Sequence, residues 1–229
     1  MLSLSLVGVV APILRIQNWS INSKIGRLDR VTLTRKGQAT RERIVAAASR
    51  LMLDQGVART TVEDIQGAAA VSPSQLYHYF PGKNALVLAV IEYQTGQVLD
   101  AQCQGLDTLD NFDALGNWRD LMVGILTATQ CAGGCPLGSL ASDLSESDPV
   151  ARVQLANAFQ MWESLIQDGL TRMQDRGELS RSADTAQLAV AMLAAVQGGL
   201  LLSQVRRSPD PLIKSVDTMI DHLRTLAVS

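Results

Sequence analysis

Apolar residues recur at helical spacing along most of the chain, beginning near Thr40. The first such segment carries one apolar stripe at positions i, i+3, i+4, i+7 and i+8, formed by Ile44, Ala47, Ala48, Leu51 and Met52. Glycine beyond the last periodic residue is typical of a helix end, so Gly56 predicts where this helix stops. The pattern therefore predicts an amphipathic first helix.

Two short helices are predicted to follow. The run Thr60-Thr61-Val62-Glu63-Asp64 offers a capping box in either of two registers, which marks a second helix start. Val71-Ser72-Pro73 ends that helix and begins a third, because Ser72 is a good N-cap and Pro73 suits the first helical position. Pro81-Gly82 stops the third helix. Three helices with a tight turn between the last two form a helix-turn-helix pattern.

The rest of the chain predicts longer helices joined by loops, one of which is expected over residues 107–116. The expected helices cover residues 84–104, 118–130, 137–144, 150–176, 184–205 and 212–226. No alternating strand pattern and no repeat of fixed length occurs. The predicted fold class is all-α, with a three-helix N-terminal helix-turn-helix unit and a larger C-terminal helical region.

The third predicted helix holds three of the nine aromatic residues of the chain, Tyr77, Tyr79 and Phe80. Leu76 and Phe80 are spaced i, i+4 and should face the core. The side chains that remain outward are Ser74, Gln75, His78 and part of Tyr77 or Tyr79. Short polar groups let a backbone approach base edges, and longer ones reach flanking phosphates, so this pattern favours a recognition helix.

This region resembles the DNA-binding domain of the TetR/AcrR family of transcriptional regulators. The resemblance extends in order over about fifty residues and is carried by the segments 43–48, Gly56, 60–65 and 71–86. Its most diagnostic piece is the Leu-Tyr-His-Tyr-Phe run at 76–80 followed by Lys83. The resemblance implies a DNA-binding domain ahead of a larger helical domain that dimerises and usually binds a small inducer.

The resemblance also implies a role for nine residues at an operator. Thr61 and Ser72 would cap helices and contact phosphate, and Lys83 would contact a phosphate at the start of the fourth helix. Pro73, Ser74 and Gln75 would face base edges. Tyr77, His78 and Tyr79 would contact both bases and the DNA backbone. Many family members have a Lys-Gly pair where this chain has Pro73-Ser74. Because proline has no backbone N–H donor and no charge, the sequence does not decide whether the residue at position 73 contacts bases.

Each of these residues also has a purely structural interpretation. His78 could lie on the helix surface without any contact, and one of the two tyrosines could pack partly inward. Four basic residues near the first helix are most simply a solvated basic face, and their position also suits contacts with the DNA backbone. They are Arg35, Lys36, Arg41 and Arg43.

The net charge of −2 hides an asymmetry. Residues 1–90 hold 11 Lys+Arg and 5 Asp+Glu, a balance of +6, whereas residues 91–229 hold 9 and 17, a balance of −8. Restricting the first count to residues 35–90 leaves 7 basic and 4 acidic residues, a balance of +3. An anionic partner is thus expected for the first part alone, although the motif indicates DNA more strongly than the charge does.

The C-terminal region suggests a dimer surface and a ligand pocket. Helices 184–205 and 212–226 could form the dimer interface, because the first of them carries small residues that allow another helix to approach closely. Alternatively, these small residues pack inside one subunit. They are Ala189, Ala191, Ala194, Ala195, Gly198 and Gly199. Six apolar residues could line a concave pocket or be plain core: Trp118, Met122, Leu126, Phe159, Trp162 and Met192. The segments 134–140, 159–162 and 197–199 resemble a subgroup associated with drug or flavonoid-like inducers.

Other sites and functions find little support in the sequence. The chain has no glycine-rich phosphate loop and no His-Glu-x-x-His pair, and two histidines leave no serine triad, so we expect no enzyme and no cofactor. Three cysteines cannot form an all-thiolate metal site, so Cys103, Cys131 and Cys135 are expected to be structural thiols rather than a redox switch. This cysteine usage fits a reducing compartment, here the cytoplasm.

The first fourteen residues are almost entirely apolar and uncharged, but they lack the charged start and cleavage site of a secretory signal. They are also too short to span a membrane, which needs about 20 residues. We expect residues 1–34 to be a disordered or non-native extension, with the natural protein starting near Val31 or beyond. The expected domains are then 35–97 for DNA binding and 98–229 for ligand binding and dimerisation.

The sequence thus predicts a dimeric DNA-binding transcriptional regulator, a repressor released from a palindromic operator on double-stranded DNA by a small apolar inducer. Its dimer would form through helices 184–205 and 212–226, with no membrane involved. The alternative is a helical protein that binds a small molecule without binding DNA.

Overall fold

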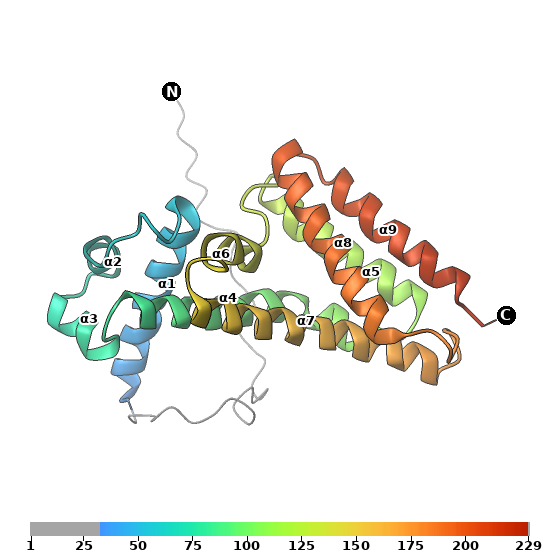
Figure 1. The fold of residues 1–229 in the computed structure, drawn as a ribbon, viewed down its shortest axis with the longest axis horizontal. Coiled ribbons are helices and arrows are strands. Elements are labelled where there is room, and N and C mark those ends of the chain that lie inside the picture. The colour runs from blue at the N-terminus through green and yellow to red at the C-terminus, as the bar shows by residue number, and fades with distance from the viewer. Residues whose placement is uncertain (1–32, 229) are drawn as a thin grey trace. The chain divides into compact units, whose positions relative to one another are not determined.

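The computed structural model describes residues 33–228, and residues 1–32 and 229 lie outside the described part. The described chain folds into nine helices and one isolated antiparallel bridge between Leu179 and Ala227. The helices are α1 Arg35–Gln55, α2 Val62–Ala69, α3 Pro73–Tyr79, α4 Lys83–Asp107, α5 Phe112–Ala128, α6 Pro136–Leu144, α7 Pro149–Asp175, α8 Thr185–Arg206 and α9 Asp210–Thr225. The all-α prediction is confirmed (Figure 1).

Helices α1 to α3 follow the predicted order, but α1 begins at Arg35, five residues before the predicted start near Thr40. The Thr34 hydroxyl accepts a hydrogen bond from the Gly37 amide at 3.2 Å, which satisfies a free N–H of the first turn. Residues 35–38 are polar apart from Gly37, and Ala39 is exposed, so the pattern of buried positions carries no signal for this turn. The expected extension over residues 1–34 lies outside the described residues, apart from 33 and 34.

The long helix α4 runs without a break through the expected domain boundary between residues 97 and 98. Its first half buries Leu86, Val90 and Ile91, and its second half buries Leu99 and Leu106. A buried side-chain hydrogen bond joins Gln94 on α4 to Ser49 on α1. The division at residue 97 therefore stays a prediction about function, because one helix serves both regions.

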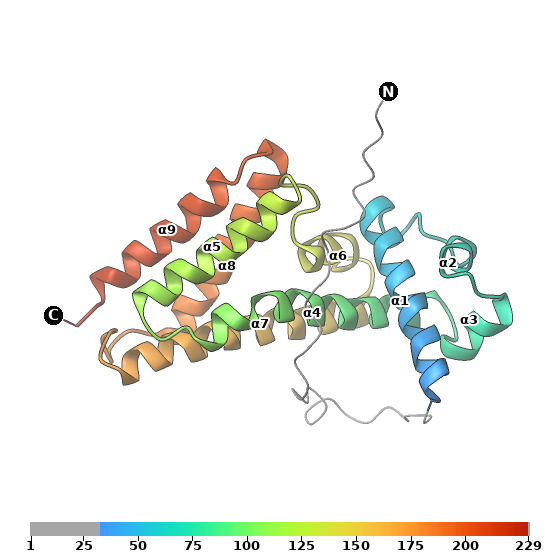
Figure 2. The same cartoon turned by 180° about the vertical axis from the view of Figure 1, so that it is seen from behind.

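The C-terminal helices pack in pairs. α4 and α7 run alongside each other, with Gln154 Nε2 donating to the Leu88 carbonyl at 2.9 Å and Arg172 Nη2 donating to that of Leu106 at 2.7 Å (Figure 2). α8 packs against α7 and α9, α5 against α4 and α9, and the short α6 against α4 and α7. The result is a layered helical body with one continuous hydrophobic core.

The loop predicted over residues 107–116 is wrong, because α5 begins at Phe112 and leaves a loop of only four residues. The side chain of Asn111 accepts from the Ala114 amide at 2.9 Å, which caps the helix. Gly116 sits within α5, where a single glycine is tolerated at a cost of about 1 kcal/mol relative to alanine. Residues 107–116 were predicted to be a loop because the segment contains several polar residues and a glycine, so the N-cap at Asn111 was not recognised.

Among the described helices, α8 is the one long and apolar enough to cross a membrane by length and composition. Its buried face, which includes Leu188, Met192 and Val196, belongs to the core shared with α7 and α9. A core helix of this kind passes the same test, so the finding is weak evidence for a membrane span.

The contact between α8 and α9 depends on the missing side chain of Gly199. A Cβ at this position would lie 2.8 Å from the Leu212 Cα and 2.5 Å from the Ser215 Oγ. The Leu212 backbone cannot move aside as a flexible side chain would. We therefore expect Gly199→Ala to lower the free energy of unfolding by about 1–3 kcal/mol, measured by urea denaturation.

The control for that substitution is Gly124→Ala on α5, where a Cβ would have no neighbour within 4 Å. Alanine should there leave the free energy of unfolding unchanged or raise it by up to about 1 kcal/mol, because it favours helix. Equal stability of the two variants would contradict the close approach of α8 and α9.

Candidate nucleic-acid interface

The turn between α2 and α3 is fixed by two capping boxes, one at each helix start. The Thr61 hydroxyl accepts from the Asp64 amide at 3.1 Å while the Asp64 carboxylate accepts from the Thr61 amide at 3.0 Å. Ser72 and Gln75 repeat this exchange at 3.2 and 3.0 Å. Of the two registers that the sequence allowed, the structure uses the one starting at Thr61. Ala70, in the left-handed region at φ 50°, ends α2.

The carboxyl of Asp64 has a lowered pKa. The hydrogen bond with the Thr61 side chain is the main cause, and the bond with the Thr61 backbone adds to it. Both bonds favour the ionised form, which also suits the positive end of the helix dipole. The stabilisation that the ionised Asp64 carboxylate gives the α2 cap is thus fully present above the ordinary aspartate pKa of 3.8 and is lost as the pH falls through the lowered value.

Helix α3 presents one buried side and one exposed side. Leu76 is fully buried and Phe80 is 3% exposed, so both anchor the helix in the core as predicted. The residues of the other side are exposed: Ser72, Pro73, Ser74, Gln75, Tyr77 and His78. This division leaves a row of polar and aromatic side chains on a short, rigidly capped helix.

The two tyrosines divide between these sides. Tyr77 is 53% exposed, whereas Tyr79 is half-buried and packs against the hydrophobic core. The His78 ring stands edge-on to the Tyr79 ring, with their centroids 4.9 Å apart. The expectation that one tyrosine packs partly inward is confirmed, and His78 has a neighbour rather than an isolated surface position.

Lys83 begins α4 beside this row, and its Nζ lies 3.4 Å from the Ala58 carbonyl oxygen. That bond is long, so it leaves the ammonium able to meet another acceptor. Of the nine residues predicted to contact DNA, eight lie at the start of α2, on α3 or at its N-cap, and Lys83 follows on α4. Their contacts with DNA stay a prediction.

Two of the basic residues on α1 are not simply solvated, which corrects the sequence interpretation. Arg43 Nε donates to the Ala69 carbonyl at 2.9 Å and so satisfies the last turn of α2. The guanidinium of Arg41 lies over the Phe80 ring, 5.2 Å from its centroid. Both arginines hold the three helices together, and no local sequence signal shows this because their partners lie 26 and 39 residues away along the chain.

The six residues proposed for an apolar pocket lie in or against the core. Phe159 is partly buried, and the other five are almost fully buried: Trp118, Met122, Leu126, Trp162 and Met192. The Trp118 indole donates to Gln102 Oε1 at 3.2 Å, whereas the Trp162 indole N–H is buried without an acceptor among the described residues. The structure brings the six to one core, and their role as ligand contacts stays a prediction.

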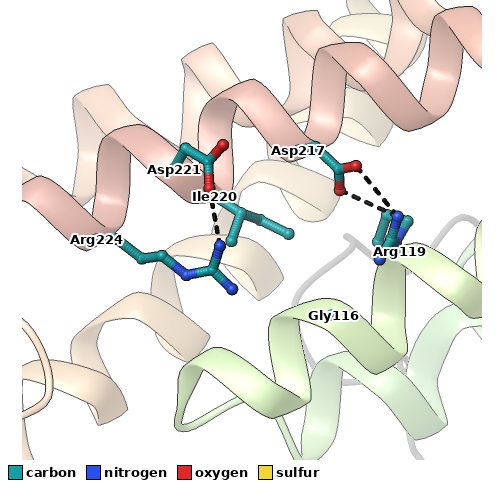
Figure 3. Close-up of a pocket in the computed structure, with 6 residues that line it drawn as sticks. All are labelled: Gly116, Arg119, Asp217, Ile220, Asp221 and Arg224. Atoms are coloured by element: carbon teal, nitrogen blue, oxygen red, sulfur yellow. Dashed lines mark hydrogen bonds and ion pairs between the residues drawn. The ribbon is translucent and has the colours of Figure 1, made fainter.

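A different hollow lies between α5 and α9 and is polar (Figure 3). Arg119 pairs with Asp217 at 3.1 Å across the two helices, and Arg224 pairs with Asp221 along α9 at 2.8 Å. Gly116 and Ile220 complete the lining. Because both arginines are already paired with carboxylates, the hollow offers no unbalanced charge to a ligand.

The cysteines are buried or half-buried, and their structural role stays a prediction. Cys131 and Cys135 are buried, Cys103 is half-buried, and all three are free. Burial raises the pKa of the Cys135 thiol, which keeps it protonated and unreactive. The described residues contain no group of three His, Cys, Asp or Glu side chains that could hold a metal ion.

The capping box of α3 can be tested through Ser72. Ser72→Ala leaves the Gln75 amide without its side-chain acceptor and should lower the free energy of unfolding by about 1 kcal/mol, measured by urea denaturation. Ser72→Asp retains an acceptor and should recover most of that loss. Stability unchanged in the alanine variant would contradict the cap.

The chain matches two family models in the order that its fold suggests. Residues 44–90 match the bacterial regulatory proteins of the tetR family, and residues 112–218 match the C-terminal domain of LmrA/YxaF-like transcriptional regulators. The first match covers the end of α1, the helix-turn-helix and the start of α4.

Known proteins of similar sequence and fold agree. The chain is 26% identical over 184 residues to the HTH-type regulator YxaF of Bacillus subtilis, covering 79% of this chain and 93% of YxaF. It is 25% identical over 193 residues to the HTH-type transcriptional repressor DhaR of a Mycobacterium species, covering 80% and 91%. A TetR regulatory protein from Rhodobacter sphaeroides has the same fold, with a TM-score of 0.71, 23% identity and coverage of 80% and 98%.

Regulators of this family bind DNA operators and are dimeric. The chain belongs to the TetR family of transcriptional regulators, with the family's helix-turn-helix DNA-binding domain preceding an LmrA/YxaF-like C-terminal domain.

Proposed function

We propose that the protein is a cytoplasmic, dimeric repressor that leaves a roughly palindromic operator when a small apolar inducer binds. The observation that carries this proposal is the exposed row on α3, held by two capping boxes and anchored from behind by Leu76 and Phe80. A short helix so fixed suits insertion into a major groove. DhaR, a repressor by name, supports the direction of control.

In this proposal the nine predicted residues make different kinds of contact with the operator. Gln75 contributes in a particular way, because its Oε1 already accepts the Ser72 amide and leaves the Nε2 group as donor. A donor suits the acceptors on a base edge, such as those of guanine or the thymine carbonyl. Pro73 contributes shape and no donor, while Lys83 neutralises a phosphate.

The proposed dimer face lies on α8. Its exposed apolar side chains repeat at helical spacing, with Val190 52%, Leu201 60% and Val205 75% exposed. Ala194 and Gly198 are exposed between them. Such a stripe is unusual on a free surface and typical of an interface, and a two-fold partner would also supply the second recognition helix.

The small residues of α8 divide between the two alternatives that the sequence left open. Ala189 and Gly199 are buried, and Gly199 packs against α9 within the subunit. A Cβ at Gly198 would have no neighbour within 4 Å, so nothing within the described chain requires glycine there. We infer that Gly198 serves the close approach of a second α8 at the two-fold axis. The exposed side of α9 is polar, so α9 would contribute the rim of the interface.

The proposed inducer would bind among the buried residues around Trp162. Its unpartnered indole N–H is available to an acceptor on an otherwise apolar molecule. Release requires that the inducer bind the DNA-free conformation more tightly than the DNA-bound one. The alternative function is a small-molecule-binding protein without DNA binding, in which the row on α3 would have no ligand.

Tyr77→Ala distinguishes these two functions. Tyr77 is exposed, so its loss should reduce affinity for DNA of the protein's own promoter region about tenfold and hardly change the melting temperature. Fluorescence anisotropy titration measures the affinity. Tyr93→Ala, also exposed but on α4, is the control and should bind DNA as the unchanged protein does. A folded wild-type dimer that does not bind this DNA at low salt would refute the regulator.

Gly198→Ala tests the dimer face by the sign of its effects. Alanine on an exposed helix should stabilise the subunit by up to about 1 kcal/mol, but at a helix crossing its methyl group separates the partners. We expect the dimer dissociation constant to rise about tenfold, measured by sedimentation velocity. Gly124→Ala should leave that constant unchanged, and the same result for Gly198→Ala would place the interface elsewhere.

A further inference from the structure

We propose that Asp143 on α6 is a positioning residue that fixes the corner between α1 and α2, and with it the orientation of the helix-turn-helix. The DNA-binding part of this inference rests on the proposed function. The contact that carries it joins parts of the chain 86 residues apart.

One backbone N–H group joins the α1–α2 corner to α6. The Val57 amide donates to Asp143 Oδ2 at 2.9 Å, in a partly buried position, and the Val57 residue is 6% exposed. A buried N–H without an acceptor is costly, and a bond to a charged acceptor is stronger than one to a neutral group. Gly56 precedes this donor, and its φ of +87° is a left-handed conformation that favours glycine and turns the chain there.

Further hydrogen bonds connect the corner to the start of α2. Thr60 is fully buried, and its hydroxyl donates to the Gly56 carbonyl at 2.9 Å. Thr61 follows at once and is the N-cap of α2. The residues between the end of α1 and the start of α2 therefore form one hydrogen-bonded unit. Asp143 joins this unit to α6, and the longer bond from Lys83 to the Ala58 carbonyl joins it to α4.

The other end of α6 approaches α8. A Cβ at Gly138, in the first turn of α6, would lie 3.1 Å from Gln197 Oε1, and one at Gly134 would lie 2.5 Å from Gln204 Oε1. Arg207, which follows α8, donates from Nη1 to the Cys131 carbonyl at 3.0 Å. The segment leading into α6 thus rests on one side of α8, and α6 itself packs on α4 and α7.

Helix α6 is therefore a short strut between α8 and the α1–α2 corner (Figure 1). The exposed side of α8 carries the proposed dimer stripe, so the same helix would face the partner and also approaches the start of α6. The Asp143 carboxylate joins the far end of α6 to the α1–α2 corner.

The test combines operator affinity with amide exchange in the full-length dimer. Asp143→Ala removes the acceptor, and we expect affinity for the promoter DNA to fall at least fivefold with the salt dependence unchanged, because the phosphate contacts remain. Asp143→Asn keeps an oxygen acceptor and should bind within twofold of the unchanged protein. Asp168→Ala, an exposed carboxylate on α7, is the matched control and should have no effect.

Hydrogen exchange of the Val57 amide tests its hydrogen bond to Asp143 in the absence of DNA. The amide should exchange slowly in the unchanged protein and in Asp168→Ala, and at least tenfold faster in Asp143→Ala. Rapid exchange in the unchanged protein, or an affinity of Asp143→Ala equal to or above that of the control, overturns the inference. If the unchanged protein binds no DNA, the proposed function fails while the exchange measurement still decides the contact.

Discussion

The continuity of α4 is the constraint on which the rest of the structure depends. One helix of 25 residues contributes Leu86, Val90 and Ile91 from its first half and Leu99 and Leu106 from its second half to a single hydrophobic core. An unbroken helix transmits displacement because its backbone hydrogen bonds resist bending. The Gln94–Ser49 bond fixes it to α1, and the bond from Gln154 to Leu88 fixes it to α7. The two regions therefore share a core rather than a flexible linker.

The helix-turn-helix shows how a small unit can be rigid without a large core of its own. Its short helices bury few residues, and isolated helices of this length are unstable in water. Capping boxes satisfy the free donors at both helix starts, and Arg43 and Arg41 add long-range contacts from α1. Buried Leu76 and Phe80 then fix the rotation of α3 about its axis. The exposed row follows from these constraints.

Within the C-terminal region the glycines show which helix surfaces need close approach. A Cβ at Gly199 would meet Leu212 on α9, and one at Gly169 would meet Leu109 in the loop between α4 and α5. Gly198 meets nothing within 4 Å. Adjacent glycines on one helix therefore have different causes, because successive residues point about 100° apart around the axis. A sequence pattern alone assigns them both to the same stripe.

The elements whose signals are local could be predicted from the amino-acid sequence. The third helix, its Ser72 cap and the inward Leu76 and Phe80 follow from spacing and side-chain chemistry within a few residues. The start of α5 was missed because its cap sits in a polar run. The sequence left the register of the Thr61 box open, although its two residues are only three positions apart. The partners of Arg41 and Arg43 and the Asp143–Val57 contact were decided by the tertiary structure. These join residues distant along the chain, and packing alone brings such residues together.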